Sequence, residues 1–245
     1  MRLQDNVAIV TGGGGGLGEG ISLSLAGEGA SIVVSDVNLQ NAEKVAARVN
    51  ESGGHALALQ ADVTNAKDCA HTVAAALETY GRLDTLVCNA GADGLPHANP
   101  ETTPLLENVL EEDWDIVMNV NLKGVFLSCR AAIPHFKDQA QGRIINISSI
   151  ALQLAPYHVN ANCIFPGIIW TSMWERLATY MTRSNPALAE VSSTDAFNGV
   201  VQQMIPFGKP QTVEDIGNTA VFLASDDAKE ITAQALNVCG GIRMN

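Results

Sequence analysis

A run of glycines directly after an apolar segment constrains this chain more than any other feature. Residues Ile9 to Gly18 read I-V-T-G-G-G-G-G-L-G, and a helix-like segment follows as far as Ala26. The order of strand, glycine turn and helix places backbone N–H groups and a helix N-terminus against a phosphate. Glycine is needed there because a Cβ atom would keep the backbone away from a pyrophosphate. The turn therefore predicts a nucleotide site, and a flexible loop is the alternative.

An acidic residue after the second predicted strand narrows the nucleotide to NAD. The apolar segment 31–35 ends at Asp36, about 20 positions beyond the glycines, where a dinucleotide fold places the carboxylate that receives the ribose hydroxyl groups. No Arg or Lys lies between Arg2 and Lys44 to receive a 2′-phosphate, so NAD is favoured over NADP. A P-loop is disfavoured because Leu17-Gly18-Glu19 stands where Lys and Ser or Thr would be required.

Length and charge restrict the class of protein and its partners. With 245 residues and 47% hydrophobic residues, the chain is long and apolar enough for one large α/β domain. A formal net charge of −12 argues against nucleic acid and against an anionic membrane as partners. No stretch is expected to approach a membrane-spanning length and no signal peptide is recognised, so the sequence predicts a cytoplasmic protein.

The cysteines and histidines give no support for a metal site. The five cysteines form no C-x-x-C pair, and the five histidines form no H-E-x-x-H or similar spacing. Most of the cysteines lie in apolar segments. We therefore expect buried free thiols in a reducing compartment, and no metal.

Predicted strands and helices alternate along the whole chain. We expect strands at 6–10, 31–35, 55–60, 83–88, 143–147, 159–165 and 235–238. We expect helices at about 18–26, 39–52, 64–80, 111–137 and 212–225, with Thr64 and Thr212 as N-caps. Such alternation predicts a Rossmann-type, doubly wound parallel sheet in a three-layer α/β/α domain that covers residues 1–245. The irregular segments 92–110 and 168–207 are expected to wall a substrate pocket.

One connection between neighbouring strands is short. Only residues 148–158 separate the strands predicted at 143–147 and 159–165, and this segment contains Pro156 but no convincing amphipathic helix. Parallel neighbours need a crossover of about a dozen residues or more, usually with a helix. Either this junction is built differently or a segment is absent.

Several short motifs, taken in their order, resemble those of the short-chain dehydrogenase/reductase family in its classical form. The resemblance covers residues 6–241 and implies a set of cofactor-binding positions. These are Thr11, Gly12, Gly14, Gly15, Gly16, Leu17 and Gly18 in the turn, Asp36 and Val37, the adenine-contacting Asp62 and Val63, Asn89, Ala90 and Gly91 after a strand, and Pro166, Gly167, Ile169 and Thr171 beside the nicotinamide. Asn121 resembles the active-site asparagine of the family, and Ser149 resembles its catalytic serine.

The resemblance also implies an activity and an assembly. Members of the family transfer a hydride between a nicotinamide and a secondary alcohol or ketone, with a tyrosine as general acid and base. A lysine four residues later lowers the pKa of that tyrosine, because a phenol near its ordinary pKa of about 10 is a poor base at neutral pH. Reduction of a 3-oxoacyl thioester is the alternative, although it more often uses NADP. The family further implies a homo-oligomer, a tetramer or a dimer, built partly on the helix over 111–137.

The proton-transfer pair of the family is missing from the sequence. Four residues beyond Tyr80, Tyr157 and Tyr180 stand Asp84, Ala161 and Ser184, so no Tyr-x-x-x-Lys occurs. Tyr157 resembles the end of the family's catalytic helix rather than its tyrosine, which puts the gap between about Gln153 and Leu154, at the short connection. Two hypotheses follow. Either the natural protein contains a helix-bearing segment that these 245 residues omit, or the deletion is real and the chain is a catalytically inactive NAD-binding protein.

The substrate is poorly determined by the sequence. The apolar residues expected to line its pocket are Trp170, Met173, Trp174, Leu177 and Met181, with packing or oligomer contact as the alternative role. Basic residues in this segment are few, namely Arg176 and Arg183, so a strongly anionic substrate is disfavoured. The sequence favours a secondary alcohol or ketone, such as a polyol or cyclic alcohol.

Overall fold

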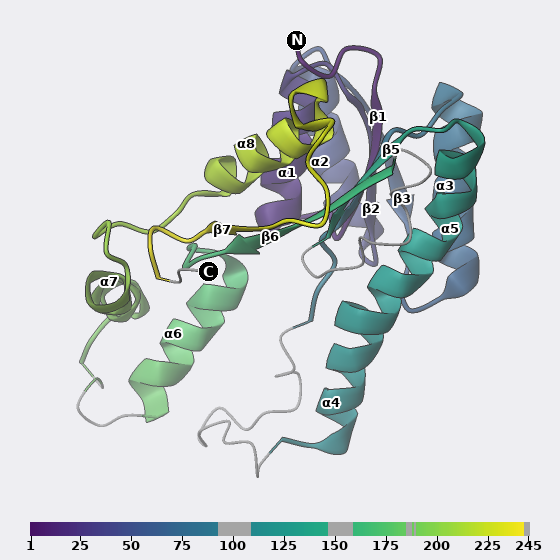
Figure 1. Ribbon diagram of the computed structural model, residues 1–245. Helices are drawn as coiled ribbons and strands as arrows, with labels where there is room; N and C mark the ends of the chain where they lie inside the picture. The colour runs from purple at the N-terminus through teal and green to yellow at the C-terminus, as the bar shows by residue number, and fades with distance from the viewer. Residues whose placement is uncertain (93–108, 147–158, 185–187, 189, 243–245) are drawn as a thin grey trace.

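A seven-stranded parallel sheet forms the centre of the protein (Figure 1). The structure, a computed structural model, describes residues 1–92, 109–146, 159–184, 188 and 190–242. The strands are β1 Val7–Thr11, β2 Ser31–Asp36, β3 His55–Gln60, β4 Thr85–Cys88, β5 Gly142–Asn146, β6 Val159–Pro166 and β7 Ala235–Val238. Their order in the sheet is β3-β2-β1-β4-β5-β6-β7, and every neighbouring pair is parallel. The predicted doubly wound α/β fold is confirmed.

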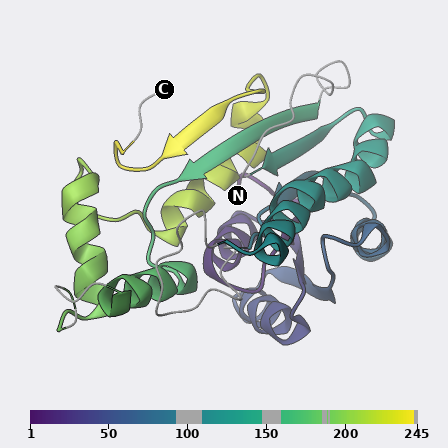
Figure 2. The same cartoon turned by 90° about the horizontal axis from the view of Figure 1, so that it is seen from below.

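Helices cover both faces of this sheet. They are α1 Gly16–Gly27, α2 Leu39–Glu51, α3 Ala66–Tyr80, α4 Glu111–Val117, α5 Val125–Asp138, α6 Ser172–Ser184, α7 Ser193–Met204 and α8 Val213–Ala224. Figure 1 and Figure 2 show α1, α2 and α8 on one face and α3 with α5 on the other. The helices α6 and α7 pack on each other beyond the carboxyl ends of the strands (Figure 2).

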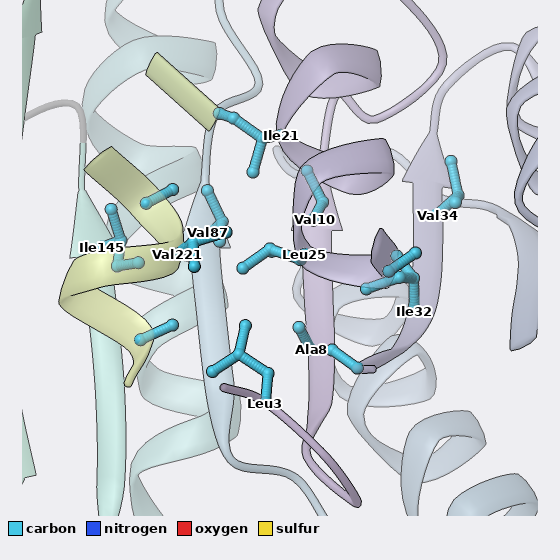
Figure 3. Close-up of a cluster of buried hydrophobic side chains, with 14 of the residues drawn as sticks. Leu3, Ala8, Val10, Ile21, Leu25, Ile32, Val34, Val87, Ile145 and Val221 are labelled. Atoms are coloured by element: carbon cyan, nitrogen blue, oxygen red, sulfur yellow. The ribbon is translucent and has the colours of Figure 1, made fainter. Parts of the chain in front are cut away.

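Alternation along the strands divides the core into two layers. Val10, Val34 and Ile145 pack with Ile21 and Leu25 of α1 on the face that α1, α2 and α8 cover (Figure 3). The neighbouring residues of the same strands, Ile9, Val33 and Ile144, pack with α3 and α5 on the opposite face. Because successive strand residues point to opposite faces and both faces are covered, these strands read as continuous apolar runs.

The helix starts show which N-cap predictions hold. Thr212 caps α8 through a capping box, since its Oγ1 accepts a hydrogen bond from the N–H of Asp215 at 3.2 Å and its own N–H donates to Asp215 Oδ2 at 2.9 Å. The prediction for Thr64 was wrong by one residue. Asn65 caps α3, because its Oδ1 accepts from the N–H of Lys67 at 2.9 Å and Asn is a better N-cap than Thr.

The long helix expected over 111–137 consists of three parts. A π-helical segment, Met118–Gly124, joins α4 to α5. The 28-residue stretch Glu111–Asp138 contains an 18-residue window with a mean hydropathy of 1.3, so by length and composition it would suit a membrane span, and the expectation that no stretch approaches this length was wrong. This test does not distinguish a membrane span from a core helix, and α5 packs on α3, β4 and β5, with Phe136 completely buried. The apolar residues of α5 therefore belong to the helix layer that α5 forms with α3 on one face of the sheet.

The crossover between β5 and β6 is the unusual connection. The two strands pair in parallel, with Gly142 opposite Val159 and Asn146 opposite Cys163. The chain must therefore return from the carboxyl end of β5 to the amino end of β6 within residues 147–158, which lie outside the described residues. A strand as long as β5 rises about 16 Å, whereas an extended chain of this length spans up to about 40 Å. The connection is thus long enough without the helix that such crossovers normally contain.

Candidate active site and cofactor cleft

A cavity of about 730 Å³ opens at the carboxyl ends of the strands. It lies where β1 meets β4, at the point where the chain, after building β2 and β3 on one side of β1, continues on the other side. Ligands of open parallel sheets bind at such a switch point. Among the predicted positions, its lining includes Gly12, Gly14, Gly15, Gly16, Leu17, Asp36, Val37, Asp62, Val63, Asn89, Ala90, Gly91, Pro166, Gly167, Ile169 and Thr171.

The glycine turn is tight on its inner side and open toward the cavity. Gly12 and Gly16 have φ of +60° and +54°, a backbone conformation that side chains rarely adopt. A Cβ atom on Gly18 would lie 2.1 Å from the carbonyl oxygen of Gly12, so this position packs against the start of the turn. A Cβ atom on Gly15 or Gly16 would meet nothing within 4 Å. These two glycines leave free space at the N-terminus of α1, as a phosphate cradle requires.

Asp36 is fixed to the turn by backbone hydrogen bonds. Its Oδ2 accepts from the N–H of Gly14 at 3.0 Å, and its Oδ1 accepts from the N–H of Asn38 at 2.9 Å. A Cβ atom on Gly14 would lie 2.9 Å from Oδ2, so the glycine permits this approach. Each carboxylate oxygen can accept more than one hydrogen bond, which leaves capacity toward the cavity. The carboxylate is therefore held in place with acceptor capacity for hydroxyl groups.

Thr11 and Asn89 join the end of β4 to the turn from behind. The Thr11 hydroxyl accepts from the N–H groups of Asn89 and Ala90 at 3.0 and 3.2 Å, and donates to the carbonyl of Val87 at 3.2 Å. Asn89 Nδ2 donates to the carbonyls of Thr11 and Gly12, both at 3.0 Å. Thr11 is 4% exposed, and neither it nor Gly18 is part of the cavity lining. Thr11 and Gly18, although predicted as cofactor-binding positions, therefore hold the shape of the turn and do not face the cavity.

Asn121 is placed in the π-helical segment and binds backbone. Its Oδ1 accepts from the N–H of Ala92 at 2.7 Å, and its Nδ2 donates to the carbonyl of the same residue at 3.0 Å. Its neighbour Val120 and Ala92 itself line the cavity. π-helical turns occur frequently at functional sites. Ser149, the other predicted catalytic residue, lies outside the described residues.

The start of α6 forms one wall of the cavity, and the residues that line this wall were predicted only in part. Of the five residues predicted to line a substrate pocket, Met173 and Trp174 line this cavity, whereas Trp170, Leu177 and Met181 are not part of its lining. Trp170 and Trp174 also pack edge-to-face on Phe197 of α7, with ring centroids 4.8 and 5.5 Å apart. Both proposed roles, lining and packing, therefore apply to this segment. The lining residues that were not predicted are Asn41, Ala61, Thr64 and Val120, and no local motif marks them. Ala92, Ser172 and Arg176 also line the cavity and belong to the segments 92–110 and 168–207 that were expected to wall a pocket.

All five cysteines are buried and stand outside any disulfide bond. Cys88, the residue before Asn89, has its Sγ 4.0 Å from that of Cys129. The hydrogen bond with Cys129 and burial both raise the pKa of the Cys88 thiol, so it stays protonated and unreactive at neutral pH. Among the described residues, no group of three His, Cys, Asp or Glu side chains is arranged to hold a metal ion.

A second cavity, of about 600 Å³, lies at the amino ends of β5 and β6, on the side of the sheet opposite the first cavity's strand ends. Its lining includes Arg143, Asp226, Asp227, Lys229 and Glu230. Ligands of open α/β sheets bind outside the carboxyl ends of the strands, and this cavity adjoins the amino ends. We therefore place the candidate site in the first cavity.

Sequence comparison places this chain in a family. The family model described as short chain dehydrogenase matches residues 6–155, and a second model, described as Enoyl-(Acyl carrier protein) reductase, matches residues 149–243. With a fold and a cleft of this kind, the chain belongs to the short-chain dehydrogenase/reductase family, as its motifs indicated. The two matches overlap at residues 149–155, within the short crossover between β5 and β6.

Characterised relatives span nearly the whole chain. The (2S)-[(R)-hydroxy(phenyl)methyl]succinyl-CoA dehydrogenase subunit of Thauera aromatica is 33% identical over 269 residues, with 98% of each chain covered. A 2,5-dichloro-2,5-cyclohexadiene-1,4-diol dehydrogenase of Sphingobium indicum is 34% identical and covers 98% of this chain and 97% of its own. The first comparison extends over 269 positions against 245 residues here, so part of that relative stands opposite gaps in this chain.

Solved structures agree with the fold. NAD+-bound xylitol dehydrogenase superimposes with a TM-score of 0.86 at 26% identity, over 98% of this chain and 100% of the other. Levodione reductase superimposes with a TM-score of 0.84 at 27% identity, over 98% of both chains. The chain is thus an oxidoreductase homologue in sequence and in fold.

Proposed function

We propose that this protein is an NAD-dependent oxidoreductase that transfers a hydride between the nicotinamide and a secondary alcohol or ketone. The observation that carries the proposal is the carboxylate of Asp36, held by Gly14 beside the glycine turn. It would accept hydrogen bonds from the ribose hydroxyls of NAD and repel the 2′-phosphate of NADP. The NAD+-bound xylitol dehydrogenase neighbour supports this cofactor.

The cleft suits a dinucleotide along its whole lining. The open space at Gly15 and Gly16 admits a diphosphate against the N-terminus of α1, where backbone N–H groups favour an anion. Val37, which is 65% exposed, and Val63 would flank the adenine. Thr171 would hold the nicotinamide carboxamide. The bound dinucleotide supplies the hydride acceptor or donor, and these residues bind and orient it.

Proton transfer is the incomplete part of the proposed mechanism. The Ser149 hydroxyl would hydrogen-bond the substrate oxygen, and Asn121, fixed to Ala92, would belong to the proton relay. A tyrosine with a lysine four residues later is not in the sequence. The longer alignment with the Thauera relative supports the hypothesis of a missing helix-bearing segment. A real deletion would instead give an NAD-binding protein without turnover.

Intact mass of the purified natural protein separates these two hypotheses. A mass larger than 25.8 kDa by a helix and its flanks would establish the missing segment, and turnover with NAD is then expected. A mass near 25.8 kDa would establish the deletion, and NAD binding without turnover is then expected. In the latter protein, turnover that survives Tyr157→Phe would contradict both the inactive protein and a catalytic Tyr157.

The cofactor proposal is tested by replacing Asp36. We expect Asp36→Asn to lower the affinity for NAD+ about tenfold or more, because hydrogen bonds to a charged group contribute about 1.5–3 kcal/mol. The variant should also narrow the preference for NAD+ over NADP+, since the repelling charge is removed. Isothermal titration of both nucleotides measures this, with Glu51→Gln on the exposed end of α2 as the control. Equal binding of NAD+ and NADP+ by the unmodified protein would refute the proposal.

Reduction of a 3-oxoacyl thioester is the second candidate function. It is favoured by the 3-oxoacyl-[acyl-carrier-protein] reductase of Thermotoga maritima, which is 29% identical over 99% of both chains. A preference for NADPH and activity on acetoacetyl thioesters, with none on simple secondary alcohols, would establish it over the first candidate.

We also propose that the protein is cytoplasmic and homo-oligomeric. Each copy would consist of one domain, in which residues 168–207 border the substrate. Four exposed apolar side chains repeat at every fourth position along α4, the π-helical segment and α5, namely Trp114, Met118, Leu122 and Phe126, which are 54%, 36%, 57% and 50% exposed. Such a row favours burial against a second copy. Light scattering of the purified protein, with Leu122→Lys as the disrupting variant, distinguishes a tetramer or dimer from a monomer.

A further inference from the structure

The turn that follows β6 is held from behind by a buried glutamine. This turn forms the wall of the cleft at the carboxyl end of β6, and its lining residues are Pro166, Gly167, Ile169 and Thr171. Gln211, which directly precedes the N-cap of α8, is 9% exposed and is not part of the lining. Its N–H donates to the carbonyl of Ile168 at 3.2 Å. Gln211 therefore contacts the wall from a side that the cleft does not reach.

Two glycines make room for the side chain of Gln211. A Cβ atom on Gly167 would lie 2.1 Å from Gln211 Oε1, and a Cβ atom on Gly240 would lie 2.5 Å from Nε2. Gly167 directly follows β6, and Gly240 lies two residues beyond β7, so the amide is packed between the ends of two neighbouring strands. A side chain at either glycine would displace the amide or the backbone. The side chain of Gln211 therefore takes the space that side chains at these two positions would fill.

The amide of Gln211 contributes more packing than hydrogen bonding. Its Oε1 is buried and has no hydrogen-bond partner among the described residues, and its Nε2 donates to the carbonyl of Lys209 at 3.5 Å, the upper limit for such a bond. Buried amide oxygens are nearly always hydrogen-bonded. A residue that departs from this rule at a cost in stability is typical of a position that serves a site.

We propose that Gln211 is a positioning residue for the nicotinamide, because it fills the space behind Gly167 and so fixes the turn against which the ring rests. This role rests on the proposed function, which places the nicotinamide beside Gly167, Ile169 and Thr171. A shorter side chain at position 211 would leave a void into which the turn can relax. The adenosine and diphosphate positions depend instead on Asp36 and the glycine turn, which other hydrogen bonds hold.

Two ligands that differ only in the nicotinamide ring test this role without requiring turnover. ADP-ribose is NADH without that ring. Both are titrated calorimetrically into the unmodified protein, Gln211→Ala, Gln211→Asn and Gln211→Met, and the fluorescence of bound NADH reports the surroundings of its ring. Gln202→Ala is the matched control, since Gln202 is exposed in the last turn of α7, donates to the carbonyl of Gly208 at 2.8 Å and is not part of the lining.

We expect Gln211→Ala to weaken NADH binding about tenfold, because the turn can move away from the ring, and to change ADP-ribose affinity by less than about twofold. The fluorescence of bound NADH should shift toward that of free NADH. Gln211→Met has nearly the same length and requires no hydrogen bond, so it should restore most of the NADH affinity. Gln211→Asn, shorter by one methylene, should show a smaller loss of the same kind, and it provides the test if the alanine variant does not fold. Gln202→Ala should match the unmodified protein.

A merely structural role gives a different result. Equal losses of NADH and ADP-ribose affinity in the Gln211 variants, or no loss in any of them, would overturn the positioning role. A loss specific to NADH that Gln211→Met does not restore, or that Gln202→Ala shares, would also overturn it.

Failure of the proposed function has its own signature. An unmodified protein that binds NADH and ADP-ribose equally, with the fluorescence of free NADH, would overturn the role of Gln211 and leave the adenosine half of the cofactor site intact. An unmodified protein that binds neither ligand would refute the cofactor assignment itself, and the role of Gln211 with it.

Discussion

The two halves of the sheet differ in how completely they are covered. In the first half, β1 and β4 are buried along their whole length between two helix layers, one that contains α1 and α2 and one that contains α3 and α5. In the second half, α8 is the described helix that packs on β6 and β7. Ile164, on the α8 face of β6, is 1% exposed, whereas its neighbour Phe165 is 45% exposed. The glycine turn lies beside β1 in the half with helices on both faces, and the short crossover lies in the half where cover by the described helices is thinner.

The largest expected effect comes from two truncations on β6, which compare a residue on its covered face with a residue on its exposed face. Ile164→Ala should lower the free energy of unfolding by about 2–5 kcal/mol, because it removes a buried side chain and leaves a cavity. Phe165→Ala should cost less, about 1.5 kcal/mol or below, because much of the ring is already in water. Urea denaturation of both variants measures the difference.

The same two variants can also contradict the difference in cover between the two halves of the sheet. A cost for Phe165→Ala as large as that of a buried Phe, about 3–5 kcal/mol, would mean that the natural protein covers this face of β6. Such a result would also support the missing-segment hypothesis over a real deletion.

Three glycine variants test the covered half. In a helix, Gly→Ala alone stabilises by about 1 kcal/mol, yet at Gly18 the new Cβ would lie 2.1 Å from the Gly12 carbonyl oxygen. We expect Gly18→Ala to destabilise by about 1–3 kcal/mol. Gly27→Ala, on the same helix with nothing within 4 Å, should be neutral or stabilising in thermal denaturation.

Gly15→Ala separates stability from binding. The added Cβ meets nothing within 4 Å and the residue has an extended backbone, so stability should be unchanged. Affinity for NAD+ should nevertheless fall, because the methyl group occupies space that the diphosphate needs. A Gly15→Ala protein that binds NAD+ normally would place the diphosphate elsewhere.

The smallest expected effect concerns α8, which supports the second half. Thr212→Ala removes the capping box and should cost about 1 kcal/mol. Thr212→Ser keeps the hydroxyl and should restore most of it. An equal loss in both variants, measured by thermal denaturation, would show that the methyl group and not the hydrogen bond matters.

Much of the fold was predictable because its signals are local. The strands agree with the predicted ranges to within two residues at each end, since buried parallel strands are short apolar runs. The capping box at Thr212 was also readable from neighbouring residues. The π-helical segment over Met118–Gly124 was not predicted, because its residues have no spacing that distinguishes them from an α-helix.

The candidate site divides in the same way. The glycine run, Asp36 and the missing Tyr-x-x-x-Lys are properties of residue type and spacing. The sequence by itself therefore predicted a dinucleotide turn and a preference for NAD, and it determined that these 245 residues contain no Tyr-x-x-x-Lys. The tertiary structure decided that Thr11 supports the turn from behind and that Arg176 faces the cleft. These facts depend on the pairing of β1 with β4 and the packing of α6 on α7, contacts between residues far apart in the chain that no local pattern encodes.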